Sequence, residues 1–284
     1  MHSAAFIRIT RPANSLAVGA LVLASCLVAG VGKGVSFPVA LAVLGSVLVA
    51  AGGYVLNDVF DYETDRITHR ERVLPRGDMS QTTARVYALV LLVGSPLLFL
   101  FINRLSFVNA SLAALLLFVY SWKLKRTSGV VGNLAASFLA SNGALIGGFV
   151  IGNLVNVMPL AICVFFATIS REIVKDIEDL PGDRTTRART LPMLIGGRKA
   201  ARLAAFSLCL AILATYLPYQ QAMFGRAYLV VASAVNTIVL YTAIRLALGS
   251  GEGISISQRL IKAEMFLYIL IFLLTALFGV VQGA

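Results

Sequence analysis

The chain has 284 residues, of which 58% are apolar and only 13% are charged, and its formal net charge is +11 at pH 7. The apolar residues form repeated uncharged runs of roughly 18 to 25 residues, the length of a transmembrane helix, so we expect an all-α polytopic membrane protein and not a soluble one. Because the chain has only two histidines and three widely separated cysteines, a zinc site, histidine acid–base chemistry and a disulfide framework are not indicated.

Nine membrane spans are predicted in chain order, within one domain of residues 1–284. Their approximate bounds are 13–31, 37–57, 83–102, 106–121, 129–150, 155–174, 200–217, 227–248 and 261–280. The first span, with Arg8 and Arg11 before it, also resembles a signal sequence, and residues 23–26 resemble a lipoprotein cleavage site. A first transmembrane helix explains the same pattern, and the many spans that follow favour it.

The basic residues between the spans predict the orientation of the protein. All but three of the 24 Lys and Arg residues lie in the N-terminal segment or near the connections after the even-numbered spans; the exceptions are Lys33, Arg104 and Arg226. By the positive-inside rule, the N-terminus and these connections are cytoplasmic and the C-terminus lies outside the plasma membrane. This one-sided charge attracts anionic lipid headgroups or a diphosphate, and we do not interpret it as a nucleic-acid site.

The acidic residues are concentrated in two of the cytoplasmic connections. Eleven of the 13 fall within residues 57–80 and 171–198, which follow the second and sixth spans. Membrane orientation requires no acids on this side, so their concentration indicates a function. We call these connections the first and second acidic segments.

In the first acidic segment, Asn57, Asp61 and Asp65 are spaced at i, i+4 and i+8, which places them on one face of a helix. Three oxygen-bearing side chains on one face suit a hard cation such as Mg²⁺, which also accepts phosphate oxygens as ligands. The alternative interpretation is a helix end whose charges are simply solvated.

In the second acidic segment, Asp176, Asp179 and Asp183 follow the spacing i, i+3 and i+7. Pro181 predicts that the helix ends near residue 180, in which case Asp183 reaches the site from a turn. Two acidic faces that point at each other repel unless cations lie between them, so Mg²⁺ between the segments would remove this cost.

Basic residues follow the acids in both segments, in the same order along the chain. These residues are Arg66, Arg70 and Arg72 in the first segment and Arg184 and Arg187 in the second. Their guanidinium groups suit forked hydrogen bonds to diphosphate oxygens. The alternative is that they serve only as the positive-inside signal. The repeated acid-then-base order is also a weak internal repeat.

These patterns resemble a known family. The motif Asn57-Asp58-x-x-Asp61-x-x-x-Asp65, followed by Arg72-Val73-Leu74-Pro75, resembles the first signature of the UbiA superfamily of intramembrane prenyltransferases. Asp176-x-x-Asp179-x-x-x-Asp183, followed by Thr190-Leu191-Pro192, resembles the second signature, and residues 120–126 are similar to the basic loop of the family. The resemblance covers essentially the whole chain. It implies a nine-helix bundle around a central cavity, with cytoplasmic cap segments after helices two and six.

The resemblance also implies a ligand set, with two Mg²⁺ ions that bridge a prenyl diphosphate. The implied metal ligands are Asn57, Asp61, Asp65, Asp176, Asp179 and Asp183, among which Asp61, Asp65, Asp179 and Asp183 would be catalytic. Asp58 and Glu178 point away from the two acidic faces and are expected not to be ligands. The implied substrate-binding residues are Arg11, Asn14, Arg66, Arg72, Tyr120, Lys123, Lys125 and Ser141.

The chemistry implied by this arrangement is departure of diphosphate to leave an allylic carbocation, which a dry site protects from water. Aromatic rings near the site suit stabilisation of that cation, and the candidates are Tyr54, Phe60, Tyr62, Tyr120 and Trp122. The alternative for these residues is an aromatic belt at the membrane interface.

The fifth span carries a polar stripe of Asn133, Ser137 and Ser141. Such a stripe either lines a substrate site or joins neighbouring helices. The pattern Gly132-Asn133, followed by Ser137, Asn142 and Gly147-Gly148, resembles the archaeal branch of the superfamily, as do Thr10-Arg11-Pro12-x-Asn14 and residues 171–183. That branch transfers a geranylgeranyl group from geranylgeranyl diphosphate to the free glycerol hydroxyl of geranylgeranylglyceryl phosphate, a lipid acceptor.

Other functions remain open at this point. Within the superfamily, the acceptor is alternatively an aromatic acid such as 4-hydroxybenzoate, or a haem-type ring. A Mg²⁺ or phosphate transporter would place charges near the middle of the membrane, where the predicted spans have almost none. The glycine-rich aspartate motif of CDP-alcohol phosphotransferases is missing. Besides the two substrates and the bilayer, the sequence indicates no obligate protein partner.

Overall fold

The computed structural model of the protein describes residues 3–30, 35–125, 129–180, 189–249 and 253–278. Within these residues the long elements are all helical. They are α1 (Ser3–Ile9), α2 (Pro12–Ala29), α3 (Phe37–Phe60), α4 (Tyr62–Thr68), α5 (Gln81–Leu97), η1 (Leu98–Phe101), α6 (Arg104–Val119), η2 (Tyr120–Leu124), α8 (Gly129–Ile151), α9 (Leu154–Glu178), α11 (Leu191–Ile195), α12 (Gly197–Gln220), α13 (Arg226–Leu248) and α14 (Ile254–Phe278).

Nine of the helices in the described part of the chain are long and apolar enough to cross a membrane, when η1 is counted with α5 and η2 with α6. The predicted all-α fold with nine spans is therefore confirmed. The ninth span begins at Ile254 and not near 261 as predicted. The prediction started too late because Arg259 and the polar residues before it interrupt the apolar run, although they belong to the helix.

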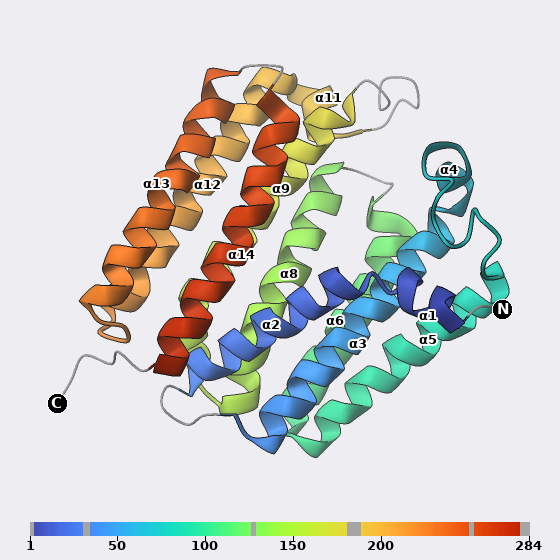
Figure 1. Ribbon diagram of the computed structural model, residues 1–284, viewed down its shortest axis with the longest axis horizontal. Helices are drawn as coiled ribbons and strands as arrows, with labels where there is room; N and C mark the ends of the chain where they lie inside the picture. The colour runs from blue at the N-terminus through green and yellow to red at the C-terminus, as the bar shows by residue number, and fades with distance from the viewer. Residues whose placement is uncertain (1–2, 31–34, 126–128, 181–188, 250–252, 279–284) are drawn as a thin grey trace.

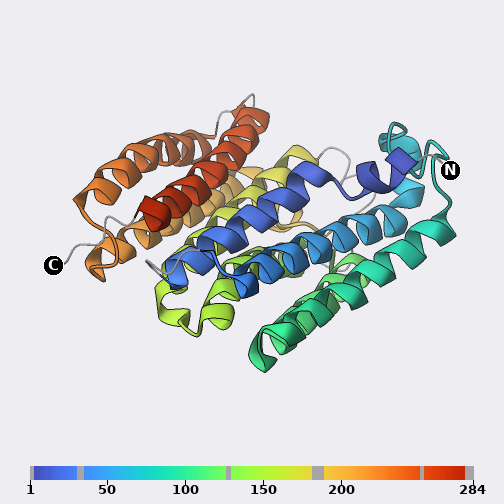
Figure 2. The same cartoon turned by 60° about the horizontal axis from the view of Figure 1, so that its bottom comes forward.

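The bundle is arranged in three groups of helices. Figures 1 and 2 show α12, α13 and α14 at one end, α3, α5 and α6 at the other, and α2, α8 and α9 between them. The central group joins both ends, since α9 packs against α12 and α8, and α2 packs against α3, α8 and α14. The largest core cluster accordingly draws buried residues from α2, α8, α9, α12, α13 and α14.

Small residues allow the central helices to approach closely. The Ser25 hydroxyl of α2 donates to the backbone carbonyl of Ala144 in α8. A Cβ atom on Gly147 would overlap the backbone of Ser25, so this contact requires glycine. Where lipid removes most of the hydrophobic driving force between helices, this kind of backbone approach supplies the packing energy.

Gly129 makes a second close approach, which positions the second acidic segment. Its backbone amide donates to the carbonyl of Arg189 over 2.8 Å. A Cβ atom on Gly129 would lie 2.6 Å from the Cα atom of Thr190. Arg189 and Thr190, in the later part of the second acidic segment, therefore lie against the first residue of α8.

The first acidic segment starts in the last turn of α3 and includes α4, which follows α3 directly (Figure 1). The helix is interrupted at Asp61, so the predicted single helical face from Asn57 to Asp65 is not one uninterrupted helix. The backbone hydrogen bonds from the amide of Asp61 to Asn57 and from that of Asp65 to Asp61 are nevertheless kept. The three residues thus retain their one-turn spacing, but the Asp65 side chain is buried.

The overlap at Gly147 leads to a stability prediction. Gly147→Ala inserts a methyl group into the backbone contact between α2 and α8, which we expect to destabilise the fold by about 1–3 kcal/mol. Gly94→Ala in α5 is the matched control, because a Cβ atom there has no neighbour within 4 Å. Thermal unfolding of both variants in the same detergent measures the difference. Equal midpoints for the two variants would contradict the assigned packing.

Candidate active site

A cavity of about 440 Å³ opens within the bundle. It is bounded by residues of α2, α3, η1, α6, η2, α8, α9 and α14, most of which are apolar. Polar side chains collect near the ends of α3 and α9 and the start of α2. Those that line the cavity there are Arg11, Asn14, Tyr54, Asn57, Tyr120, Arg171 and Glu172. The cavity therefore combines a long apolar part with a polar end at the two acidic segments.

Tyr120 lies between the two acidic segments. It begins η2, a short π-helix at the end of α6, and such widened turns are frequent at functional sites. Asp61 of the first segment and both Glu172 and Asp176 of the second lie within electrostatic range of its side chain. Tyr120 thus lies within range of acids from both segments, which are more than 100 residues apart in sequence.

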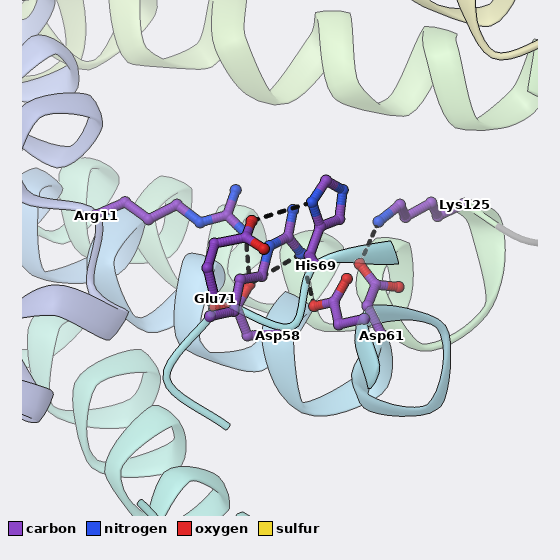
Figure 3. A network of polar contacts seen from close by, with 8 residues as sticks. Arg11, Asp58, Asp61, His69, Glu71 and Lys125 are labelled. Atoms are coloured by element: carbon purple, nitrogen blue, oxygen red, sulfur yellow. Dashed lines mark hydrogen bonds and ion pairs between the residues drawn. The ribbon is translucent and has the colours of Figure 1, made fainter. Parts of the chain in front are cut away.

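An alternating chain of acids and bases holds the first segment. Arg11 donates to the Asp58 carboxylate, Arg72 lies 3.7 Å from the same carboxylate, and Arg72 donates to Asp65 over 2.6 Å. Asp58 and Asp65 are only 4% and 3% exposed, so both charges depend on these partners. Figure 3 shows Arg11 and Asp58 within this network.

Arg11 occupies an unusual backbone position. Its φ angle of 48° lies in the left-handed region, where a non-glycine residue is strained. It forms the junction between α1 and α2, and its guanidinium lies 5.4 Å from the centre of the Tyr54 ring. The ion pair with Asp58 and this cation–π contact offset the strain and fix the start of α2 against the end of α3.

The side-chain oxygens of Asp61 and Asn57 differ in their contacts. The Lys125 ammonium lies 2.5 Å from the Asp61 carboxylate, which joins η2 to the end of α3 (Figure 3). The side-chain oxygen of Asn57 is buried and has no hydrogen-bond partner within the described residues. A buried amide oxygen without a partner is costly unless a ligand supplies one.

Residues His69 and Glu71 border this network at the surface (Figure 3), where the ring nitrogen and the carboxylate are 3.3 Å apart. The pKa of Glu71 is lowered, chiefly because its carboxylate accepts a hydrogen bond from its own backbone amide, with a further contribution from His69. The pair is exposed and separate from the cavity.

Polar contacts also fix the second segment. The side-chain amide of Asn133 donates to Asp176 over 2.8 Å, which joins α8 to the end of α9. Arg171 pairs with Glu172 at 2.7 Å on the cavity wall, and the Ser255 hydroxyl of α14 donates to Glu178. Three predicted residues, Asp183, Arg184 and Arg187, lie outside the described residues.

The remaining predicted site residues differ in whether they line the cavity. Arg11, Asn14 and Tyr120 line the cavity. Arg66 is exposed, pairs with Glu63 at 3.6 Å and stacks near the Tyr62 ring, outside the cavity. Arg72 is bound to buried Asp65, and Lys123 and Asp179 are exposed at the ends of their helices.

Ser141 does not line the cavity, in contrast to its predicted role. Its hydroxyl donates to the carbonyl of Phe138 in its own helix, and the next residue, Asn142, lines the cavity in its place. Asn142 in turn exchanges hydrogen bonds with Asn109 of α6. Of the polar stripe of α8, Asn133 contacts another helix, through Asp176 of α9, whereas the hydroxyls of Ser137 and Ser141 donate to carbonyls of α8 itself.

Three charged residues that line the cavity, Arg171, Glu172 and Lys262, were not among the predicted site residues. Lys262 of α14 lines it, together with Met265 and Phe266. The signal in the sequence was a lysine one residue after the expected start of the ninth span at residue 261.

The residues at the polar end are compatible with Mg²⁺, although the described residues contain no group of three His, Cys, Asp or Glu side chains close enough to hold a metal. Asn57 offers a buried amide oxygen without a partner, one helical turn from the Asp61 carboxylate. Amide and carboxylate oxygens, completed by phosphate oxygens, are the ligands that Mg²⁺ prefers.

Comparison with known proteins identifies the family. The family model described as "UbiA prenyltransferase family" matches residues 18–270. The chain belongs to the UbiA prenyltransferase family. It is a multi-pass membrane enzyme that transfers prenyl groups, as the sequence motifs indicated. The chain is also 37% identical over 278 residues to digeranylgeranylglyceryl phosphate synthase of Thermococcus kodakarensis, covering 98% of this chain and 99% of that protein.

Solved structures of the UbiA family have the same fold. A structure of digeranylgeranylglyceryl phosphate synthase is 29% identical and matches with a TM-score of 0.83 over 96% of this chain and 98% of that one. A UbiA homologue from Archaeoglobus fulgidus, bound to GPP and Mg²⁺, is 17% identical and matches with a TM-score of 0.63 over 95% of this chain and 99% of that one. At this low identity the second match concerns the fold alone.

The buried network of the first segment leads to a second prediction. Arg72→Met leaves the buried Asp65 carboxylate without the ion pair described above, which we expect to destabilise the protein by about 3–5 kcal/mol. Arg76→Met is the control, because Arg76 is half exposed and its pair with Asp78 at 3.5 Å lies at the surface. Thermal unfolding in detergent should separate the two variants. Unchanged stability of the Arg72 variant would show that the network does not hold the segment.

Proposed function

We propose that this UbiA enzyme transfers a geranylgeranyl group from geranylgeranyl diphosphate to the free glycerol hydroxyl of geranylgeranylglyceryl phosphate, a step of archaeal ether-lipid synthesis. The supporting observation is a mostly apolar cavity among membrane helices, whose polar end gathers groups from both acidic segments. The full-length similarity to digeranylgeranylglyceryl phosphate synthase supports the choice of lipid substrates.

The diphosphate of the donor would bind at the polar end. In this proposal Asn57 and Asp61 face it from one segment, Asp176, Asp179 and Asp183 from the other, and up to two Mg²⁺ ions lie between. When bound, Mg²⁺ neutralises negative charge on the departing diphosphate. Support comes from the unpartnered oxygen of Asn57 and from the Mg²⁺ named for the Archaeoglobus homologue.

Basic side chains would bind the diphosphate oxygens directly. Lys125 is well placed for this, because its ammonium is already fixed 2.5 Å from Asp61 and need not be ordered on binding. Arg11 presents its guanidinium at the cavity wall while Asp58 holds it. Arg72 and Asp65, in contrast, form a pair that supports the segment, so we assign them a positioning role and not direct binding.

During the reaction the bond between C1 of the prenyl group and the diphosphate oxygen breaks with both electrons on the leaving group. The acceptor hydroxyl oxygen then forms a bond to C1 and releases its proton. The apolar wall excludes water from the allylic cation, while the faces of Tyr54 and Tyr120 stabilise its charge. The prenyl chain lies along the apolar part of the cavity.

We further propose that the polar end faces the cytoplasm of the cell and that the enzyme lies in the plasma membrane. The N-terminus would be cytoplasmic and the C-terminus outside. The asymmetric distribution of Lys and Arg residues supports this orientation.

A transfer assay tests the proposal. The purified protein is incubated with radiolabelled geranylgeranyl diphosphate and Mg²⁺, with geranylgeranylglyceryl phosphate or 4-hydroxybenzoate as the acceptor. We expect labelled ether lipid only with the first acceptor, and loss of product with EDTA that added Mg²⁺ restores. Product only from 4-hydroxybenzoate would replace the lipid acceptor by an aromatic one. Full turnover in EDTA would contradict the metal requirement.

The assigned acids provide a separate prediction. We expect Asp61→Asn and Asp179→Asn each to lower kcat by about 100-fold or more, because each removes a carboxylate that would hold Mg²⁺ beside the leaving diphosphate. Asp78→Asn is the matched control in the same segment, since Asp78 pairs with Arg8 and Arg76 at the surface. Circular dichroism of each variant excludes misfolding as the cause. Wild-type turnover by both site variants would contradict the assignment.

A further inference from the structure

We propose that Lys262 binds the phosphate of the lipid acceptor at the α14 wall of the cavity. This inference rests on the proposed function, because it assumes an acceptor with a phosphomonoester head. It assigns a second anion site, separate from the site of the leaving diphosphate.

Lys262 belongs to one continuous face of α14 that borders the cavity. Lys262, Met265, Phe266 and Ile269 all line it, and their spacing of i, i+3, i+4 and i+7 is that of a single helix face. A cation followed by three apolar side chains matches a lipid with a charged head and an apolar chain. An acceptor whose phosphate lies at Lys262 would extend its chain over the other three residues.

The charge of Lys262 is not balanced by the described part of the protein. The other two cations of the cavity wall each have an acid, Asp58 for Arg11 and Glu172 for Arg171. Lys262 forms no hydrogen bond or ion pair with any residue that the structure describes. Glu264, two residues later, faces away from the cavity and accepts a hydrogen bond from Thr242 of α13 over 2.6 Å. An anionic group of the substrate would supply the partner that Lys262 lacks among these residues.

The position of Lys262 along the helix supports the same assignment. It follows Ile254, the first residue of α14, by eight residues, which corresponds to about 12 Å at the usual helical rise. Its side chain is exposed beside the cavity, and an ammonium group within an apolar helix carries a cost unless it is solvated or paired. The alternative is that the side chain extends along the helix to the membrane surface and reaches only a bilayer headgroup.

The arrangement of the helices separates the two anions. The groups assigned to the diphosphate lie at the start of α2, on α3, beside η2 and at the end of α9, whereas Lys262 lies on α14, and Figure 1 shows α2 between α14 and α3. An acceptor phosphate at Lys262 would therefore stay apart from the diphosphate, which limits repulsion between them. Its glycerol hydroxyl would point from the α14 side toward C1 of the donor.

Steady-state kinetics test this site. The full-length protein is placed in nanodiscs of uncharged phosphatidylcholine and assayed with geranylgeranyl diphosphate, Mg²⁺ and either geranylgeranylglyceryl phosphate or the same lipid without phosphate. The variants are Lys262→Gln, the charge-retaining Lys262→Arg, and the matched control Lys199→Gln. Lys199 lies on α12, is exposed and does not line the cavity.

We expect Lys262→Gln to raise the KM for the phosphorylated acceptor by roughly 10- to 100-fold, the usual effect of losing a hydrogen bond to a charged group. Its KM for geranylgeranyl diphosphate should be unchanged, which also shows that the variant is folded. Its preference for the phosphorylated over the unphosphorylated acceptor should be lost, whereas Lys262→Arg and Lys199→Gln keep it.

Two results would overturn the inference in distinguishable ways. If the wild type uses geranylgeranylglyceryl phosphate and Lys262→Gln keeps the same acceptor KM and preference, Lys262 contacts at most a bilayer headgroup and only this inference fails. If the wild type does not use that acceptor at all, the proposed function fails and this inference fails with it. An equal loss of affinity for both acceptors would also contradict a phosphate contact.

Discussion

The site depends on the pairing of two buried carboxylates with two arginines. Asp58 and Asp65 are almost completely buried, and a buried charge is tolerated only when a partner lies close by. Arg72 contacts both acids and Arg11 contacts the first. These contacts join the α1–α2 junction, the end of α3 and the following loop. These ion pairs add to the apolar contacts of the segment, in which Val73, Leu74 and Met79 are buried in one core cluster with residues of α1, α3 and α5.

Helix α8 connects this polar region to the packing of the bundle. At one end, Gly129 holds the chain that returns from the second acidic segment, and Asn133 holds Asp176. Further along, Asn142 reaches α6 and Gly147 lies against the backbone of α2. A single helix thus carries both the contacts that fix the acids and those that fix the helices around the cavity. A change in the packing of α8 is expected to reach the site because the helix is rigid.

The sequence was sufficient for the fold. Long apolar runs have one stable form in a bilayer, so the nine spans followed directly. The spacing of acids did not distinguish between roles: Asp65 has the same one-turn spacing as Asn57 and Asp61, yet it is buried against Arg72. Such a pairing depends on the folded conformation of the loop, which the local spacing of acids does not determine. Lys262 was missed for a related reason, because its importance comes from the cavity that other helices form around it.

The two interpretations of the basic residues, orientation in the membrane and binding of anions, are compatible. Arg8, Arg11, Arg66, Arg72 and Arg76 of the N-terminal segment and first acidic segment each pair with an acid in the structure. Paired charges cancel locally, so these arginines mainly give the acidic segment its shape. The excess that remains over the whole chain still gives a net charge of +11. That excess would attract the two anionic substrates proposed above, and the local pairs determine which cations remain accessible to a phosphate.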